Sequence, residues 1–169
     1  YFKTKKSLNN ICERLTMLGI EVSEVFDNQN FFRQFKIAEV IDVQEHPNAD
    51  RLKLCKVNDG KFNLNIVCGA PNVKKGMKVV LAPIGTKMLD EDFVIQKSKI
   101  RGVESEGMLC SEKEIGLGID SDGIIHLEEK AKTGNLLSSL YPSEKIIDVE
   151  ITPNRSDCLG VYGIARDLA

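Results

Sequence analysis

The sequence predicts a mainly β fold, a small closed barrel over residues 35–128 inserted into a small α/β domain built from residues 1–34 and 129–169. Three observations carry this prediction. Short alternating apolar segments separated by turn residues follow one another from Phe35 onward, as in small barrels. Longer stretches of helical spacing occur near the two ends of the chain. Neither end is long enough to bury a core alone, so the two ends are expected to fold together.

The first 34 residues are expected to form a helix, a strand and a loop. Apolar side chains recur at helical spacing over residues 7–19, with Ser7 as the N-cap and Gly19 as the stop. An alternating segment over residues 20–26 predicts a short strand. The polar run at 27–30 is typical of a loop.

The first part of the barrel is predicted to contain four strands. Residues 35–43 alternate so that one face carries Phe35, Ile37, Ile41 and Val43. The apolar residues of the segment 51–57 change phase, which predicts a β-bulge in that strand, with Lys53 and Lys56 pointing outward. Asn-Asp-Gly at 58–60 predicts a hairpin, after which the inward side chains are Phe62, Leu64 and Ile66. Residues 77–85 are nearly all apolar, as expected for a strand covered on both faces.

The second part of the barrel is predicted over residues 93–127. Residues 93–101 and 123–127 alternate as further strands. Between them, Ser111 and Glu114 have the spacing of a capping box, which predicts a helix of one or two turns. Short curved strands with one small helix near the end favour an OB-type barrel, and a β-sandwich is the alternative.

The last 41 residues are expected to complete the α/β domain. Residues 133–142 predict a short helix that Pro142 closes, and residues 145–151 predict a strand. A turn containing Pro153, Asn154 and Arg155 follows, after which Ser156 or Asp157 is expected to cap a final helix. Gly160 and Gly163 lower the stability of that helix, so another backbone is expected to pack closely there.

Composition limits the classes of function. The net charge of the 169 residues is −2, so no overall basic field favours nucleic acid. No stretch approaches the roughly 18 apolar residues that span a bilayer, so we expect no membrane partner. The five scattered cysteines include no CxxC pair, which argues against a disulfide framework and against zinc. Buried thiols in a reducing cytoplasm are expected instead.

Charge is distributed unevenly within the predicted barrel. From Arg51 to Lys78 there are seven basic residues and one acidic residue, a net charge of +6. From Lys87 to Glu128 there are five basic and ten acidic residues, a net charge of −5. One side of the barrel is therefore expected to be positive. The candidate phosphate-binding residues are Lys53, Lys56, Lys74, Lys75, Lys97, Lys99 and Arg101.

The last three of these residues alternate along the sequence, so on a strand they would share one face. A row of cations on a curved sheet suits a phosphate backbone, and the affinity would fall with added salt. A solvated sheet face that resists aggregation is the alternative interpretation. Phe62 and Phe93 are the aromatic residues near the patch, and we expect both to pack in the core rather than stack on bases.

The sequence shows no catalytic constellation. His46 precedes Pro47 and is expected to shape a turn in which Asn48 and Asp50 bond nearby backbone groups; contact with a phosphate is the alternative. A pair formed by Cys68 and His46 lacks a third partner and an oxyanion-hole motif. There is also no P-loop and no GxGxxG motif. We therefore assign no catalytic residue and no metal ligand.

Four segments in the barrel region resemble the EMAP II-like tRNA-binding domain in order and spacing: HPNADRL, IVCGAPNV, LAPIGT and KIRGVESEGMLCSEKEIGLG. This resemblance covers residues 35–127. The flanking segments LNNICERLTMLGIEVSEV and ITPNRSDCLGVYGIARDLA are similar to the N-terminal region of the bacterial phenylalanyl-tRNA synthetase β subunit. In that family an OB barrel is inserted into an α/β domain formed by both termini.

The resemblance implies a tRNA-binding and structural module that is not catalytic alone. The full enzyme is implied to be a cytoplasmic α2β2 heterotetramer that uses ATP and Mg²⁺ to attach phenylalanine to tRNA(Phe). Its aminoacylation site is implied to lie on the α subunit, and an editing site in β-subunit domains beyond Ala169. Because Tyr1 is not a methionine and the chain ends inside a predicted helix, we expect a piece of a longer protein.

Two other functions remain open from the sequence. One is a stand-alone or methionyl-tRNA-synthetase-type tRNA-binding module, although the flanking segments would have no purpose in an isolated barrel. The other is an assembly element whose main partner is protein, such as the α subunit, since the net charge is near zero and aromatic residues make up only 6% of the chain.

Overall fold

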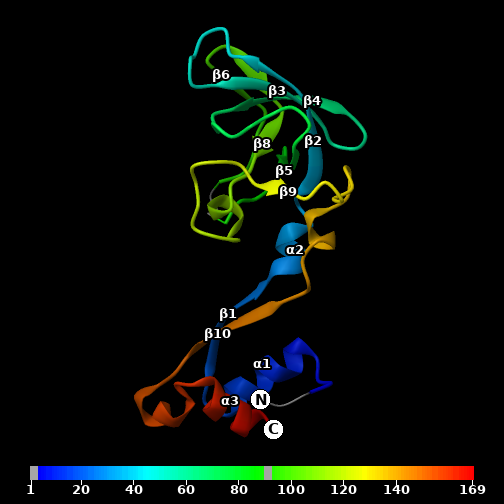
Figure 1. The fold of residues 1–169 in the computed structure, drawn as a ribbon. Coiled ribbons are helices and arrows are strands. Elements are labelled where there is room, and N and C mark those ends of the chain that lie inside the picture. The colour runs from blue at the N-terminus through cyan, green and yellow to red at the C-terminus, as the bar shows by residue number, and fades with distance from the viewer. Residues whose placement is uncertain (1–3, 90–92) are drawn as a thin grey trace. The chain divides into compact units, whose positions relative to one another are not determined.

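A computed structural model describes residues 4–89 and 93–169, and its contacts form two compact units (Figure 1). The barrel unit consists of Gln29–Ser143. The terminal unit combines the residues up to Asn28 with Glu144–Ala169. The sequence-based boundaries at residues 35 and 128 stay a prediction of where an independent domain begins and ends.

A six-stranded antiparallel sheet organises the barrel unit. Its strands follow the order β4-β3-β2-β5-β8, and β9 also pairs with β5. Strands β6 and β7 form a separate hairpin. The bounds are β2 (Lys36–Glu45), β3 (Lys53–Asn58), β4 (Asn63–Cys68), β5 (Lys78–Pro83), β6 (Ser98–Ile100), β7 (Val103–Ser105), β8 (Gly107–Leu109) and β9 (His126–Leu127).

Hydrogen bonds bring strand β4 to the junction of β7 and β8. The Glu106 N–H donates to the Asn65 carbonyl oxygen at 2.9 Å, and the Val67 N–H donates to the Ser105 hydroxyl at 3.1 Å. The sheet therefore curls toward a barrel, although no continuous ladder closes it within the described residues. This arrangement of short antiparallel strands confirms the predicted OB-type fold class.

Strand β5 lies in the sheet interior with apolar side chains on both faces. Val80 and Ala82 belong to one buried cluster, and Val79 and Leu81 belong to another. All four side chains are fully buried. The prediction of a strand covered on both faces is confirmed.

The β-bulge lies in β2, not in β3 as the sequence predicted. The pairing of β2 with β3 shifts between Val40 and Asp42, whereas β3 pairs with β4 without interruption. The extra residue, Ile41, moves the following side chains to the opposite face. Ile37 and Val43 therefore contact different clusters, although the sequence placed them on one face. In segment 51–57 the strand continues without a bulge, and Leu54 lies on the face opposite Cys55 and Val57.

Short helices complete the barrel unit. Of the run at 27–30, predicted as a loop, Asp27 ends strand β1 (Glu21–Asp27) and residues 28–30 begin helix α2 (Asn28–Phe32). Aromatic burial explains the difference, because the Phe31 ring packs edge-on against Phe35 and the Phe32 ring contacts Tyr141. The two helices predicted at 111–116 and 133–142 are present as short 3₁₀ helices, η1 (Lys113–Ile115) and η2 (Leu137–Ser139).

The terminal unit packs helices against a two-stranded antiparallel ribbon. The ribbon pairs β1 (Glu21–Asp27) with β10 (Lys145–Glu150). Helix α1 (Leu8–Met17) begins at the predicted N-cap, where the Ser7 hydroxyl accepts a hydrogen bond from the Asn10 N–H. The C-terminal part contains η3 (Pro153–Cys158) and α3 (Val161–Leu168). The buried side chains of the unit are Leu15, Ile20, Cys158 and Leu168.

The start of α3 differs from the prediction. Ser156 and Asp157 lie inside η3, and the N-cap of α3 is Gly160, which offers no side-chain bond. A Cβ atom at Gly163 would lie 1.9 Å from the Asp157 carbonyl oxygen, which confirms the expected close backbone at that glycine. A Cβ atom at Gly160 would meet nothing within 4 Å. No helix in the described part of the chain has the length and hydropathy to cross a membrane.

Candidate nucleic-acid interface

Strand β3 carries two of the candidate basic residues on opposite faces. Because side chains alternate along a strand, Lys53 shares the face of the buried Cys55 and Val57, and Lys56 lies on the other face. Lys56 is exposed. Lys53 is half-buried, and its ammonium group donates to the Pro71 carbonyl oxygen at 3.3 Å. The expected outward direction therefore describes Lys56 better than Lys53.

Lys74 and Lys75 are presented by an anchored loop between β4 and β5. The Asn72 side chain donates to the Ile124 carbonyl oxygen at 2.8 Å and accepts from the Ile124 N–H at 3.0 Å. Val73 is buried beside it, whereas the two lysines that follow are exposed. The loop thus displays two neighbouring cations from a backbone that is held in place.

The predicted row of three cations on one strand does not form. Because β6 spans only Ser98–Ile100, Lys97 precedes the strand and Arg101 lies in the following turn, with a φ of 48°. The Lys97 ammonium pairs with the Glu104 carboxylate of β7 at 2.8 Å, and this hydrogen bond raises the pKa of Lys97. All three basic side chains, including Lys99, are nevertheless exposed.

The HPNADRL turn fastens the β6–β7 hairpin. The buried His46 ring accepts from the Asn48 N–H through Nδ1 at 3.1 Å, and Nε2 lies 3.3 Å from the Ile100 carbonyl oxygen. With Nδ1 as acceptor, Nε2 carries the proton and donates. The Asn48 amide adds a hydrogen bond to the Arg101 carbonyl oxygen at 3.1 Å. The remaining turn residues singled out from the sequence are exposed: Pro47 and Asp50.

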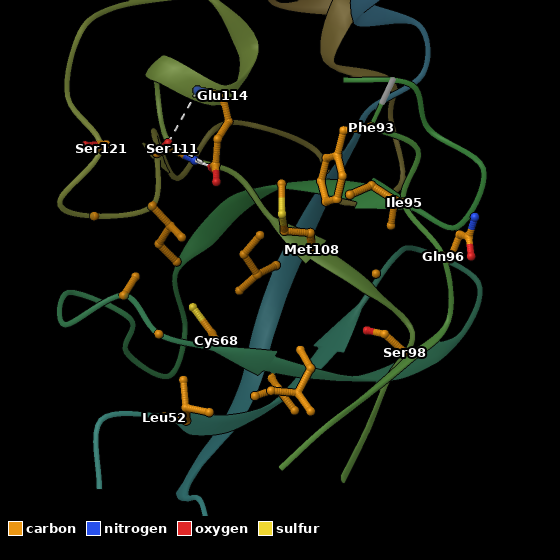
Figure 2. A pocket seen from close by; sticks show the side chains of 18 of the residues that line it. Leu52, Cys68, Phe93, Ile95, Gln96, Ser98, Met108, Ser111, Glu114 and Ser121 are labelled. Carbon is orange, nitrogen blue, oxygen red and sulfur yellow. Dashed lines mark hydrogen bonds between the residues drawn. The ribbon is translucent and has the colours of Figure 1, made fainter. Parts of the chain in front are cut away.

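A pocket of about 750 Å³ opens in the barrel unit beside β4 and β8 (Figure 2). Figure 2 shows Phe93 and Met108 on one side of it and Glu114 on another. Among its described lining residues, the charged ones are Glu114 and Asp122. Cys68 also lines the pocket, but both ring nitrogens of His46 are bonded to backbone groups, so that histidine cannot act as its base.

Two aromatic side chains are exposed near the basic residues. Phe62 is 68% exposed beside the β3–β4 turn, and Phe93 is 52% exposed at the pocket. The prediction that both pack in the core is therefore wrong. At Phe62 the cause is the turn, because the Asp59 carboxylate accepts from the Phe62 N–H at 2.7 Å and thereby sets the local backbone. Three residues of the predicted acidic stretch lie outside the described residues: Asp90, Glu91 and Asp92.

Arg155 belongs to a charged network in the terminal unit. Its guanidinium group pairs with Asp157 and Asp167, and Arg166 pairs with the same two carboxylates. With Cys158, these carboxylates place three potential metal ligands close together. Both carboxylates already pair with guanidinium groups and the third group is a thiol, so the cluster does not fit Mg²⁺, which takes oxygen ligands. The other two residues of the predicted turn are exposed at the start of η3: Pro153 and Asn154.

Sequence reasoning missed the pocket. Its lining is contributed by strands, a turn and loops that are far apart in the chain, so no local pattern announces it. One signal was present, because Met108, Ser111 and Glu114 all lie within the motif KIRGVESEGMLCSEKEIGLG. These three pocket residues therefore fall within the segment that resembles the tRNA-binding domain.

The barrel unit matches a known family. Residues 35–136 match the family model described as putative tRNA binding domain. The match covers more than half of the chain. It includes all seven candidate basic residues and the whole pocket lining.

Curated relatives match the whole chain, including both flanks. The phenylalanine–tRNA ligase β subunit of Rhodospirillum rubrum is 48% identical over 169 residues, which are 100% of this chain and 21% of that protein. The corresponding subunit of Ehrlichia canis is 50% identical over 173 residues, with the same coverage. The chain thus spans about a fifth of the length of these relatives. A solved structure of a MetRS related protein from Pyrococcus horikoshii aligns with a TM-score of 0.48 and 23% identity, over 67% of this chain and 97% of that one.

Proposed function

Because this chain belongs to the family of putative tRNA-binding domains, we propose that it is the tRNA-binding module of a phenylalanine–tRNA ligase β subunit. The observation that carries the proposal is the match over residues 35–136, the stretch that displays the exposed cations. Similarity to β subunits at 48% and 50% identity extends through both flanks. It supports this assignment over a stand-alone or methionyl-type module.

The proposal for the whole protein goes further. Together with an α subunit, in an α2β2 heterotetramer in the cytoplasm, it would attach phenylalanine to tRNA(Phe) with ATP and Mg²⁺. The aminoacylation and editing sites are proposed to lie outside residues 1–169. Within this chain the proposed role is to bind and position the RNA, and no catalytic residue is assigned to it.

The RNA backbone is proposed to contact the exposed cations of the barrel unit. Lys56, Lys74, Lys75 and Lys99 have no ion-pair partner within the described residues, so a phosphate group need not displace a carboxylate from them. Lys97 would have to exchange Glu104 for a phosphate. Contacts of this kind release counterions from the RNA, which makes the affinity depend steeply on salt.

Fluorescence anisotropy of labelled tRNA(Phe) with the 169-residue chain tests this proposal. The logarithm of the association constant should fall linearly with the logarithm of salt concentration, by about 0.7 to 0.9 for each phosphate contact. Combined charge reversal of the exposed lysines without an ion-pair partner among the described residues, Lys56, Lys74, Lys75 and Lys99, to Glu should weaken binding with little change in melting temperature. Combined reversal of Lys5, Lys6, Lys130 and Lys132 to Glu is the matched control, since it changes the net charge equally at exposed side chains outside the candidate set.

Two results would contradict the RNA role. One is the absence of binding at low salt. The other is an unchanged tRNA affinity in the charge-reversed variant together with a failure to associate with the α subunit. The second result would identify the barrel unit as an assembly element.

A further inference from the structure

The pocket of the barrel unit has no part in the proposed phosphate contacts. None of the seven candidate basic residues lies in its described lining. The charged groups that do are the carboxylates of Glu114 and Asp122. These carboxylates repel a phosphate, because like charges at short range in a partly enclosed site interact unfavourably. An uncharged part of an RNA molecule, such as a base, meets no such penalty.

One side of the pocket is suited to the flat face of a base. The Phe93 ring is 52% exposed and lines the pocket together with the buried Ile95. Met108 lies near Phe93 in Figure 2, and its thioether is a polarisable group that adapts to a flat partner. Unstacked bases in RNA are commonly bound on aromatic side chains in this way.

The other side of the pocket offers a hydrogen-bond acceptor. Glu114 is held by the capping box, in which its Oε2 accepts from the Ser111 N–H at 2.6 Å and from the Ser111 hydroxyl at 2.8 Å. The second oxygen, Oε1, has no hydrogen-bond partner among the described residues. An ionised carboxylate can only accept hydrogen bonds. The pocket therefore favours a base edge that presents donors.

Guanine fits this requirement better than the other three bases. Its Watson–Crick edge places the N1–H and the N2 amino group side by side, which are two adjacent donors. Adenine and cytosine each place a ring-nitrogen acceptor beside the amino donor, and uracil flanks its one N–H donor with two carbonyl oxygens. An acceptor facing the Glu114 carboxylate is repelled, so the pocket discriminates against these three bases.

Three of the candidate basic residues adjoin pocket-lining residues in the sequence. Lys53 follows the lining residue Leu52. On a different segment, Lys97 and Lys99 stand on either side of the lining residue Ser98. The chain segments that supply these lining residues also carry basic residues, so an RNA ligand that places a base in the pocket passes close to cations of the barrel unit.

We propose that this pocket binds one unstacked guanine base of an RNA ligand, with Phe93 and Met108 against its face and Glu114 at its Watson–Crick edge. The inference rests on the proposed function, because it takes RNA to be the ligand of the barrel unit. It goes beyond that function by naming the base and the residues that select it.

Single-stranded RNA octamers of uridine with one central guanosine or one central adenosine test the proposal, with anisotropy as the measurement. The 169-residue chain should bind the guanosine octamer about tenfold more tightly than the adenosine octamer, a difference typical of one stacked and hydrogen-bonded base. Phe93→Ala should weaken binding of the guanosine octamer about tenfold. Phe62→Ala is the matched control, because Phe62 is a similarly exposed phenylalanine outside the pocket lining, and it should change nothing.

Glu114→Gln is the variant that tests base selection. Glutamine also satisfies the acceptor role in a capping box, so the fold should persist. Because the amide oxygen stays bonded to Ser111, the group that faces the pocket is the amide N–H donor, which can pair with the ring-nitrogen acceptor of adenine but not with the N1–H donor of guanine. The variant should therefore lose the preference for guanosine and gain affinity for the adenosine octamer. A titration of the unmodified chain with guanosine nucleoside, followed by NMR of the Met108 methyl group, tests the pocket without any substitution.

The outcomes separate this inference from the proposed function. Salt-dependent tRNA binding without a preference between the octamers would overturn the guanine site and leave the tRNA-binding role intact. Unchanged affinities of the Phe93→Ala and Glu114→Gln variants for both octamers would likewise overturn the guanine site and leave the tRNA-binding role intact. Absence of tRNA binding by the unmodified chain would overturn both. Loss of α-subunit association in the pocket variants, with RNA binding unchanged, would show that the pocket holds a protein segment and would also overturn the guanine site.

Discussion

The barrel unit and the terminal unit bury their apolar side chains in different ways. In the barrel unit the two faces of β5 contact two separate buried clusters, so one strand organises both. In the terminal unit the described core has four buried residues, supplemented by partly buried side chains of the ribbon and helices. Two-stranded ribbons are marginal in water and need such packing. The terminal unit is therefore expected to be the less stable of the two.

Charged contacts also join the two ends of the chain in the terminal unit. The Arg155 guanidinium group donates to the Leu18 carbonyl oxygen at 2.5 Å and pairs with Asp167 of α3. It thus links the end of α1 to residues more than 130 positions later. The comparison teaches that the terminal unit joins the two ends of the chain by a strand ladder, a small shared core and polar contacts, whereas the barrel unit buries two larger apolar clusters.

The largest effect on stability is expected from two equivalent truncations of buried leucines, one in each unit. Leu15→Ala in the terminal unit and Leu81→Ala in the barrel unit each remove a leucine that is 2% exposed or less. Each should lower the free energy of unfolding of its own unit by about 3 kcal/mol. We expect Leu15→Ala to unfold the terminal unit and Leu81→Ala to leave the barrel unit folded. Hydrogen exchange of the amides in β10 and in β5 reports the two units separately; equal loss of protection in both units would contradict the comparison.

The next effect concerns the close backbone contact in the terminal unit. Gly163→Ala would place a Cβ atom 1.9 Å from the Asp157 carbonyl oxygen, so α3 must move away from η3. We expect a loss of about 3 kcal/mol in stability, at the upper end of overpacking effects. Gly160→Ala is the control, since its Cβ atom would meet nothing within 4 Å. Thermal melts of both variants check the prediction, and equal melting temperatures would show that α3 is free to shift.

The smallest of the three effects is a pH dependence in the barrel unit. Burial by itself raises the pKa of Asp59, but hydrogen bonds from Lys36 and from the N–H groups of Phe62 and Lys61 outweigh it and lower the pKa to about 2. The ordinary value for Asp is about 4. The stabilisation is therefore fully present above about pH 4 and is lost as the pH falls through about 2, at a cost of about 2 kcal/mol. Urea unfolding at pH values across this range measures the loss of stability in acid, and this loss should be absent in the Asp59→Asn variant.

Added salt should change the acid sensitivity of the two units to different extents. Hydrogen bonds from Arg155 and Arg166 lower the pKa values of Asp157 and Asp167, so the terminal unit also weakens in acid. These groups are more open to solvent than Asp59, and salt screens exposed charges more strongly than buried ones. Acid sensitivity should fall with salt in the terminal unit and persist in the barrel unit. The same response in both units would contradict this explanation.

The elements that depend on local chemistry could be predicted from the sequence. The Ser7 cap, the apolar run of β5 and the Asn58–Gly60 turn are each set by neighbouring residues. The bulge could not be placed, because the register of β2 depends on which residues of β3 lie opposite it. Helix α2 was missed because its aromatic side chains are buried against Tyr141, more than 100 residues later.

The positive charge of the candidate interface could be predicted from the sequence, but the arrangement of its side chains could not. The excess of lysine between Arg51 and Lys78 is a property of the sequence, and most of these side chains are exposed. The row of three cations failed because β6 ends at Ile100 and Arg101 enters a turn. Phe93 was assigned to the core because an aromatic residue in an alternating segment usually faces inward.

The sequence by itself determined the β-rich class, the positions of most strands, the uneven charge and the resemblance to a tRNA-binding family, because each is carried by residue types and short spacings. Only the tertiary structure decided which cations stand in solvent, where the bulge lies and that a carboxylate-lined pocket lies beside them. Those features depend on strand register and on contacts between residues far apart in the chain. Because each of these features results from many contacts between residues far apart in the chain, no short sequence pattern predicts it.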